Sequence, residues 1–439
     1  MRMECDSTRR MSRRDFVRAC AGAVAAPQIV HSSVLGLRGA TPPNDRITIA
    51  LVGLGTQMKM HHGIFLGYSE TQVVAVCDCE GICLKREQDR GNAHYAKQLG
   101  QERYDGVAAY RDFREIVARD DVDAMVIATP NHWHALIAVA ALKSGKDVYC
   151  EKPLALTIRE GRAMVTAARR YGRVFQTGSQ QRSSNEFRFA CEMVRSGRIG
   201  TLEKVVVNVA GPPVDSWHIP GEPVPEALDW NLWLGPAPWR TYNSIFAPGP
   251  HFEGYPNWRD YRDYAGGMMT DWGAHHFDIA QWGLGTDDTG PLEITPPNGR
   301  DIARLTYRYA NGVILEHSGI FDRVGTEFIG TEGRVMVNRG YLETDPSDIM
   351  AEATGPNEVN LYRSPGHHQD WIDCIRARKQ PICDVEIGHR SASVCHLGNI
   401  AYWVKRPLKW DPVQEEFIDD REANRLLQRA MRSPWRISV

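Results

Sequence analysis

The sequence predicts an α/β fold: an N-terminal parallel sheet, followed by a C-terminal α+β part whose open sheet is mostly antiparallel. Three observations predict it. Short apolar runs alternate with helical segments between residues 46 and 152, which is typical of parallel strands joined by crossover helices. The first run ends in a glycine-rich turn. From residue 303 on, short alternating runs are separated by hairpin signals.

The strands expected in the first part are uninterrupted apolar runs, as in strands buried on both faces. They span residues 47–52, 73–76, 124–128, 147–150 and 174–176. Helices are predicted over residues 58–66 and 134–144, the second closed by Gly145.

The turn after the first strand has the chemistry of a phosphate site. Gly53 permits the tight turn, and Gly55 lets the backbone approach a pyrophosphate at the following helix N-terminus. Asp78 lies 78 − 53 = 25 residues beyond the first glycine, near the usual interval of about 20 for the acid that binds a ribose 2′-OH. Met58 replaces the third glycine, so we expect a wider helix–strand separation or a shifted helix start. These features predict a Rossmann-type sheet.

Asp78, the acid at the end of the second predicted strand, bears on the choice between NAD and NADP. A carboxylate there repels a 2′-phosphate, so the sequence favours NAD over NADP. Lys85 and Arg86 lie nearby and leave NADP open.

Two later strand ends carry a family resemblance. Thr129-Pro130-Asn131 follows one strand, with His134 in the next helix, and Glu151-Lys152-Pro153 follows another. With the glycine turn, these motifs resemble the Gfo/Idh/MocA family of oxidoreductases, and the resemblance covers almost all of the chain after residue 46. Carboxyl ends of parallel strands meet at one sheet edge, where open α/β folds bind ligands.

The resemblance implies roles for these residues. The residues that would flank the adenosine and the nicotinamide ribose are Thr129, Pro130, Asn131 and His134. Glu151 and Lys152 would lie beside the nicotinamide ring, with Lys152 reaching the substrate hydroxyl. In relatives the Lys–Pro peptide is often cis.

The second part is predicted from alternating runs and turn signals. Its strands are expected at residues 205–209, 303–309, 313–320, 326–329 and 335–337, and its helices at 185–196, 366–377, 389–404 and 421–432. Asn311-Gly312 and Glu332-Gly333 are hairpin signals. By resemblance, the open face of the sheet often makes a subunit interface, so a homo-oligomer (dimer or tetramer) is expected.

A long insertion, residues 212–262, is rich in tryptophan and proline. Insertions of this length are often functional. Its indole faces suit sugar rings, but they equally suit a role as staples that hold the loop to the core.

Asp271 and His275 are four residues apart, so on a helix they share one face. They match an Asp-x-x-x-His pair that the family directs at the nicotinamide. An Asp/His pair can also bind a metal, but no third ligand with suitable spacing is evident, so no metal is predicted. Further candidates for substrate binding are Gln180, Arg182, Trp258, Arg259 and His276.

The predicted reaction oxidises a secondary alcohol of a sugar, polyol or inositol. Lys152 and His275 would handle the hydroxyl proton, Asp271 would orient the imidazole, and a hydride would pass to C4 of the nicotinamide. One alternative is a redox-neutral glycoside hydrolase or lyase that uses transient oxidation. Another is a non-catalytic NAD-binding sugar sensor.

Net charge and the distribution of apolar residues limit the kinds of binding partner that the chain is expected to have. The chain has 439 residues and a formal net charge of -2, so no global field recruits nucleic acid or an anionic membrane. No run of apolar residues is long enough for a membrane span. The expected organisation is an export signal and linker (1–42), an NAD-binding domain (43–175), and a domain for substrate binding and oligomerisation (176–439).

The N-terminal segment resembles a twin-arginine export signal. Arg13-Arg14 precede an alanine-rich, weakly apolar stretch with small residues near Ala25-Ala26. The alternative is a disordered basic tail. The signal implies a periplasmic or cell-surface location and a tightly bound cofactor, because free NAD is scarce outside the cytoplasm and this route carries folded proteins.

We expect a variant with Arg13→Lys and Arg14→Lys to remain in the cytoplasm, because the export receptor reads the arginine pair. Cell fractionation of the parent and the variant measures this. The same location for both would remove the export prediction.

Overall fold

The computed structural model describes residues 42–319, 324–351, 355 and 358–439. Its contacts divide the chain into two compact units, Met1–Arg46 and Ile47–Val439. The predicted export signal, within residues 12–40, lies outside the described residues. None of the described helices combines the length and the apolar character that crossing a bilayer requires. The second unit contains a parallel and a mostly antiparallel sheet, which confirms the predicted α/β fold.

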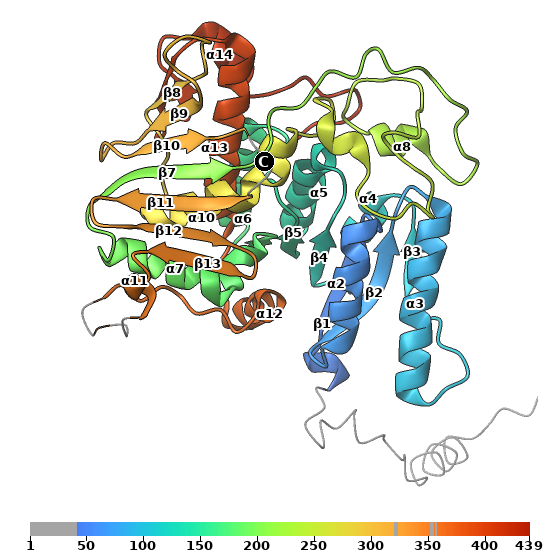
Figure 1. Ribbon diagram of the computed structural model, residues 1–439. Coiled ribbons are helices and arrows are strands. Elements are labelled where there is room, and N and C mark those ends of the chain that lie inside the picture. Colours follow the sequence, from blue (N-terminus) through green and yellow to red (C-terminus); the bar gives the residue numbers. More distant parts are fainter. Residues whose placement is uncertain (1–41, 320–323, 352–354, 356–357) are drawn as a thin grey trace, which may run out of the picture. The chain divides into compact units, whose positions relative to one another are not determined.

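Within the described ranges, the first sheet has six parallel strands in the order β3-β2-β1-β4-β5-β6 (Figure 1). The strands are β1 (Ile47–Val52), β2 (Thr71–Cys77), β3 (Ala108–Tyr110), β4 (Ala124–Ile127), β5 (Asp147–Cys150) and β6 (Phe175–Thr177). The strand order reverses between β1 and β4, and open sheets bind ligands at such a switch point.

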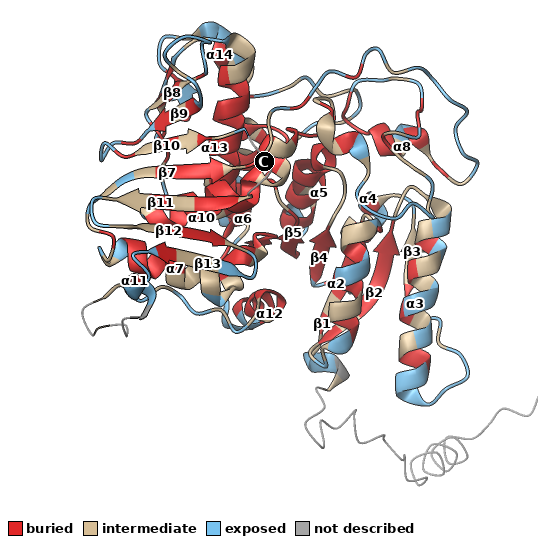
Figure 2. Cartoon of the chain, viewed as in Figure 1, coloured by how far each residue is buried: buried red, intermediate tan, exposed pale blue. Residues whose placement is uncertain are grey.

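Alternate residues of β1, β4 and β5 enter two different cores. Ile49 and Leu51 of β1 pack in a core that includes Met58, whereas Ala50 and Val52 pack in the other. These three strands are therefore buried on both faces, as their red colour in Figure 2 shows, whereas the residues of the edge strand β3 are only half-buried. This double burial explains why the sequence runs are apolar without interruption.

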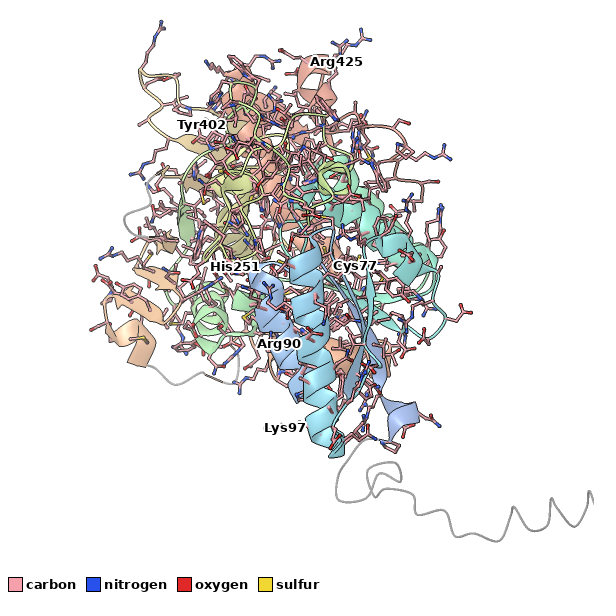
Figure 3. All side chains as sticks on the ribbon, turned by 90° about the vertical axis from the view of Figure 1, so that its right-hand side faces the viewer. Cys77, Arg90, Lys97, His251, Tyr402 and Arg425 are labelled. Carbon is pink, nitrogen blue, oxygen red and sulfur yellow. The ribbon has the colours of Figure 1, made fainter. Side chains whose placement is uncertain are left out.

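Helices connect the strands. They are α2 (Thr56–Gly67), α3 (Gly81–Leu99), α4 (Phe113–Val117), α5 (Asn131–Lys143) and α6 (Ile158–Arg170). Helix α2 begins two residues before the predicted start, and Met58 is fully buried in the first turn, which agrees with the expected shift. From the side, α3 with Arg90 and Lys97 lies along β2, which ends at Cys77 (Figure 3).

The second sheet has nine strands among the described residues, in the order β13-β12-β11-β7-β10-β9-β8-β14-β15. They are β7 (Leu202–Asn208), β8 (Glu293–Thr295), β9 (Leu305–Arg308), β10 (Ile314–His317), β11 (Gly325–Gly330), β12 (Arg334–Asn338), β13 (Tyr341–Asp345), β14 (Leu408–Asp411) and β15 (Glu416–Phe417). Only the β7–β10 pairing is parallel within these strands. The predicted hairpins at Asn311-Gly312 and Glu332-Gly333 are confirmed.

The second part also contains helices. They are α7 (Asn185–Arg195), α8 (Trp230–Leu234), α9 (Met268–Asp271), α10 (Gly273–Leu284), α11 (Asp348–Ala351), α12 (His367–Ala377), α13 (Val385–Val404) and α14 (Arg421–Arg425), with short 3-10 turns at η3 (Gln180–Ser183) and η4 (Asn257–Asp260). Another 3-10 turn, η2 (Pro43–Asp45), precedes β1. Residues of α7, α10 and α13 share one apolar core with the strands of the second sheet. The domain boundary at residue 175 stays a prediction.

Two late segments pack on the first sheet. Helix α12 places Trp371 and Ile372 in the core that holds β1. The helix predicted over residues 421–432 is wrong beyond Arg425. The chain is irregular there because Arg432 hydrogen-bonds the carbonyl oxygens of Gly235 and Asn231, and because Trp435 packs edge-on against Trp133.

The insertion has a small aromatic core of its own. Trp230 and Trp233 stack at a centroid distance of 4.7 Å, and Tyr264 packs edge-on against Trp233. These buried rings staple the insertion together, so the stapling interpretation holds for this tryptophan pair.

Candidate active site

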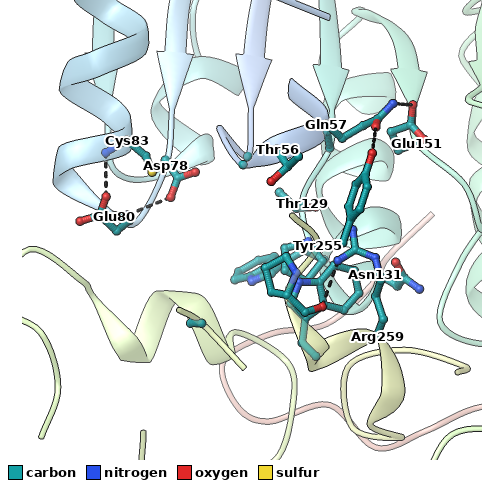
Figure 4. A pocket seen from close by; sticks show the side chains of 18 of the residues that line it. Thr56, Gln57, Asp78, Glu80, Cys83, Thr129, Asn131, Glu151, Tyr255 and Arg259 are labelled. Atoms are coloured by element: carbon teal, nitrogen blue, oxygen red, sulfur yellow. Dashed lines mark hydrogen bonds between the residues drawn. The ribbon is translucent and has the colours of Figure 1, made fainter. Parts of the chain in front are cut away.

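A cavity of about 750 Å³ opens at the carboxyl ends of the first sheet. Its walls come from the ends of β1, β2, β4 and β5, from the insertion, and from the α9–α10 junction (Figure 4). Residues predicted to bind cofactor that line it are Gly53, Gly55, Asp78, Thr129, Pro130, Asn131, His134, Glu151 and Lys152. The structure therefore brings all of them together.

The glycine turn is shaped for close approach. Gly53 has φ +83°, and a Cβ there would lie 2.7 Å from the backbone nitrogen of Thr129. Apart from the adjoining residues, no heavy atom of the described chain lies within 4 Å of a Cβ built at Gly55. No described side chain caps the N-terminus of α2. Free N–H groups beside open space fit a pyrophosphate.

Asp78 braces the same turn. Its carboxylate accepts hydrogen bonds from the backbone N–H of Leu54 (2.6 Å) and of Glu80 (2.8 Å). Burial raises the pKa of Asp78, although these hydrogen bonds act in the opposite direction. The acid thus stands at the end of β2, beside the cavity, where a ribose hydroxyl could reach it (Figure 4).

The turn after β4 leaves a polar atom unused. No described atom hydrogen-bonds the buried hydroxyl oxygen of Thr129. His134 lies between the carbonyl oxygens of Thr129 (2.9 Å) and Pro153 (3.1 Å), so its ring ties the two strand-end turns together. A neutral ring donates to only one of them. The Thr129 hydroxyl and the turn at Gly53 and Gly55 both fit a bound dinucleotide.

Lys152 reaches across the cavity to the second part of the chain. Its Nζ donates to the backbone oxygen and to Oδ1 of Asp271, both at 2.8 Å. The Lys152–Pro153 peptide is cis. Arg259 lies 3.4 Å from the same carboxylate. Burial raises the pKa of Asp271, but the charges of Lys152 and Arg259 outweigh burial and hold it below its ordinary value.

The predicted pairing of Asp271 with His275 is not what the structure shows. A break at Trp272 separates α9, which ends at Asp271, from α10, which contains His275. The Asp271 carboxylate therefore contacts Lys152 and Arg259, not the imidazole.

His275 lines the cavity as a buried imidazole. No described atom hydrogen-bonds its Nδ1. Burial, and then the charges of Lys152 and Arg339, lower its pKa well below the ordinary value. The ring is therefore neutral near pH 7, the state in which it can accept a proton.

Three of the five predicted substrate-binding residues line the cavity: Gln180, Trp258 and Arg259. The other two, Arg182 and His276, do not line it. Arg182 is buried away from the cavity, where it pairs with Asp278 and Asp287. His276 is fully buried on the other side of α10 from the cavity, where it contacts Thr326 and stacks on Trp272.

Among the cavity residues that were not predicted are Tyr255, Asp260 and Arg339. Asp260 adjoins the predicted Arg259, so the same sequence signal could have included it. Burial, and then Asp271, raise its pKa. Arg339 comes from the β12–β13 turn and lies 5.1 Å over the ring of Trp272, a placement with no local sequence signal.

The insertion covers the cavity and is tied to the first sheet on both sides; we call residues 225–256 the roof. On one side, Gly81 N donates to the Ala227 oxygen (2.9 Å) and Asp229 N to the Cys79 oxygen (3.0 Å). On the other side, the Thr56 hydroxyl at the start of α2 donates to the Gly254 oxygen (2.6 Å). A ligand lying along the strand ends would be enclosed between these ties.

Comparison with family models agrees with both parts of the fold. Residues 47–179 match the model of an oxidoreductase family's NAD-binding Rossmann fold. Residues 198–437 match the model of that family's C-terminal alpha/beta domain.

Two curated relatives are informative. A glycosyl hydrolase family 109 protein of Shewanella sp. (strain W3-18-1) is 30% identical over 182 residues, which are 42% of this chain and 38% of that protein. The chain thus spans little more than a third of that relative's length. A 1,5-anhydro-D-fructose reductase of Ensifer adhaerens is 27% identical over 264 residues, which cover 58% of this chain and 68% of the reductase.

Solved structures share the fold. An aldose-aldose oxidoreductase from Caulobacter crescentus, complexed with glycerol, has a TM-score of 0.56 and 19% identity, covering 83% of this chain and 99% of that one. A levoglucosan dehydrogenase in complex with NADH and L-sorbose gives the same values. At this identity the likeness shows the fold alone.

The buried ion pairs of Arg182 predict that its substitution lowers the stability of the protein. We expect Arg182→Ala to lower the free energy of unfolding by about 3–5 kcal/mol, because it leaves Asp278 buried without its cation. Arg339→Ala is the control. Arg339 is an exposed residue at the cavity wall, so its removal should leave the free energy of unfolding nearly unchanged. Denaturant unfolding of the three proteins measures this, and equal stability of parent and Arg182→Ala would contradict it.

Proposed function

The chain belongs to the Gfo/Idh/MocA family of oxidoreductases, and on that premise we propose that it oxidises a secondary alcohol of a sugar, polyol or inositol with NAD. The observation that carries the proposal is the contact of Lys152, at the cofactor edge of the first sheet, with Asp271, in a cavity that His275 also lines. A cation and a neutral base facing one cavity are what alcohol oxidation requires.

The residues present fit NAD. The N–H groups of Gly55 and of the first turn of α2 would hold the pyrophosphate, and Asp78 a ribose. Thr129 and Asn131 would contact the nicotinamide half, next to Glu151 and Lys152. When bound, NAD supplies the redox chemistry by accepting a hydride from the carbinol carbon.

Two side chains would act on the substrate hydroxyl, and a third would position one of them. Its oxygen would lie between Lys152 and His275, so the neutral imidazole can take the proton while the ammonium stabilises the developing negative charge. Asp271 then positions Lys152 instead of His275, through the two hydrogen bonds at 2.8 Å.

We expect Lys152→Ala and His275→Ala each to lower kcat by about 100- to 10,000-fold, the range for positioned acid–base groups, with NAD binding largely kept. Lys85→Ala is a matched control, because Lys85 is exposed, pairs with Asp89 and lies outside the cavity. Initial rates on a panel of sugars and inositols, with NAD binding followed by fluorescence, measure this. Near-parental turnover in both variants would refute the assignment.

The roof favours a second candidate, a redox-neutral glycoside hydrolase or lyase. A cofactor held under these ties to Thr56, Cys79 and Gly81 would exchange slowly, and each catalytic cycle would then begin and end with the oxidised form. Oxidation of one hydroxyl would acidify a neighbouring C–H, and elimination of the glycosidic oxygen would leave a double bond. In a hydrolase water would add to that bond before reduction restores the alcohol, whereas in a lyase the double bond would remain. The similarity to a glycosyl hydrolase family 109 protein supports this candidate.

The redox-neutral candidate needs a resident cofactor, and so does the proposed export. We expect protein purified without added NAD to retain NAD through gel filtration, and Thr56→Val, which removes one tie, to release it faster.

Aryl glycosides and free sugars then separate the candidates: product without net NADH supports the hydrolase, and steady NADH supports the dehydrogenase. Loss of all NAD on gel filtration would contradict the resident cofactor.

A further inference from the structure

One cation at the cavity wall has an unused hydrogen-bonding edge. Arg339, in the turn after β12, lines the cavity and is exposed to solvent. Its Nε donates to Oε1 of Gln181 at 3.3 Å, and its guanidinium carbon lies 5.1 Å from the centre of the Trp272 ring. Among the described residues, no acceptor hydrogen-bonds its two terminal nitrogens, and no carboxylate lies at ion-pair distance from them.

We propose that Arg339 binds a carboxylate of the substrate, so that the preferred substrates are sugar acids. The inference deepens the proposed function and rests on it, because it assigns the substrate class of the same cavity. The reacting hydroxyl would lie between Lys152 and His275, and the carboxylate would lie against Arg339 at the cavity wall.

The guanidinium is oriented for this contact. A guanidinium that stacks on an aromatic ring keeps its N–H edge available, and two parallel N–H groups match the two oxygens of a carboxylate. The ring of Trp272 supports one face of Arg339 and itself stacks on the buried ring of His276. Because Nε is already bonded to Gln181, the two terminal nitrogens form the edge that remains for a ligand.

Arg339 is also tied to the proposed base through a single amide. Gln181, which is 2% exposed, accepts from Arg339 and donates from Nε2 to the backbone oxygen of His275 at 3.3 Å. Burial lowers the pKa of His275, and the charges of Lys152 and Arg339 lower it further. Since Arg339 and His275 border the same part of the cavity, we expect the carboxylate and the reacting hydroxyl to belong to one sugar residue.

The other two cations at this end of the cavity already have a carboxylate. Lys152 and Arg259 both face Asp271, at 2.8 Å and 3.4 Å. Glu151 acts on Arg339 only from a distance, and its own hydrogen bonds go to other side chains. Of these three cations, therefore, only Arg339 lacks a carboxylate partner among the described residues, and an acidic substrate would supply it.

A carboxylate suits this place better than a phosphate. A phosphate monoester carries a charge of about −1.5 to −2 near pH 7 and presents three acceptor oxygens. One guanidinium edge satisfies two oxygens and one charge. Asp260 and Asp271 line the same cavity and would repel a second negative charge.

The functional test compares sugars that differ by one carboxylate: glucose with glucuronate, and galactose with galacturonate, in the protein supplied with NAD. Aryl glycosides of the same pairs serve the hydrolase candidate, and glucose 6-phosphate is the third arm. We expect the parent to have a kcat/KM about 10- to 100-fold higher for the acid, the range for a hydrogen bond to a charged group. In Arg339→Ala, the ratio of acid to neutral sugar should fall by the same factor.

The matched control is Arg334→Ala. Arg334 lies on β12 of the same hairpin, pairs with Glu327 and Asp345, and is outside the cavity, so its loss should leave the ratio at the parental value. A parent without preference for the acid, or a preference that survives in Arg339→Ala, would overturn the inference. An equal fall for acids and neutral sugars would make Arg339 a support for Gln181 and would also overturn it. A stronger, Arg339-dependent preference for glucose 6-phosphate would overturn the assignment to a carboxylate.

A second readout needs no turnover. Isothermal titration calorimetry with glucuronate and galacturonate should show binding to the parent that is about 10- to 100-fold weaker in Arg339→Ala. A parent that turns over none of the sugars or glycosides but binds the acids in this way would refute the proposed function and leave the inference supported. Equal affinity in parent and variant, or no binding of either acid, would overturn the inference.

Discussion

The hydrogen-bonded ion pair of Lys152 with Asp271 is the contact on which the arrangement of the cavity depends. It joins the end of β5 to the junction of α9 and α10, and it uses two oxygens of one residue. A partly buried ion pair is favourable only when hydrogen bonds compensate its desolvation. Here the second bond to the backbone and the nearby Arg259 provide that compensation. The position of the ammonium is therefore set by both parts of the chain.

Five strands of the first sheet could be predicted because burial leaves an uninterrupted apolar run. Strand β3 was not predicted, because it is short and its residues are only half-buried. Helix α3 was not predicted, although it has 19 residues. Its buried positions include Glu87, which pairs with His62, and Gly91, which packs closely against Val107. A carboxylate and a glycine in core positions hide the helical period, since their burial depends on partners from other elements.

The candidate site was predictable where a strand end fixes direction, as at Thr129 and Lys152. It was not predictable where the geometry of a helix determines which side chains face the cavity and which face the core. The spacing of Asp271 and His275 assumes one continuous helix, but the break at Trp272 gives the two residues different partners. Arg182 and His276 adjoin cavity residues in sequence, yet they point into the core.

The packing of α12 on the first sheet has a consequence for biosynthesis. Trp371 and Ile372 complete the core around β1, and Trp435 packs behind Trp133 at the cavity wall. When the ribosome has synthesised only the first six strands, the core beside β1 therefore still lacks Trp371 and Ile372. The nucleotide site becomes complete only when nearly the whole chain has emerged, so cofactor loading belongs to the end of synthesis.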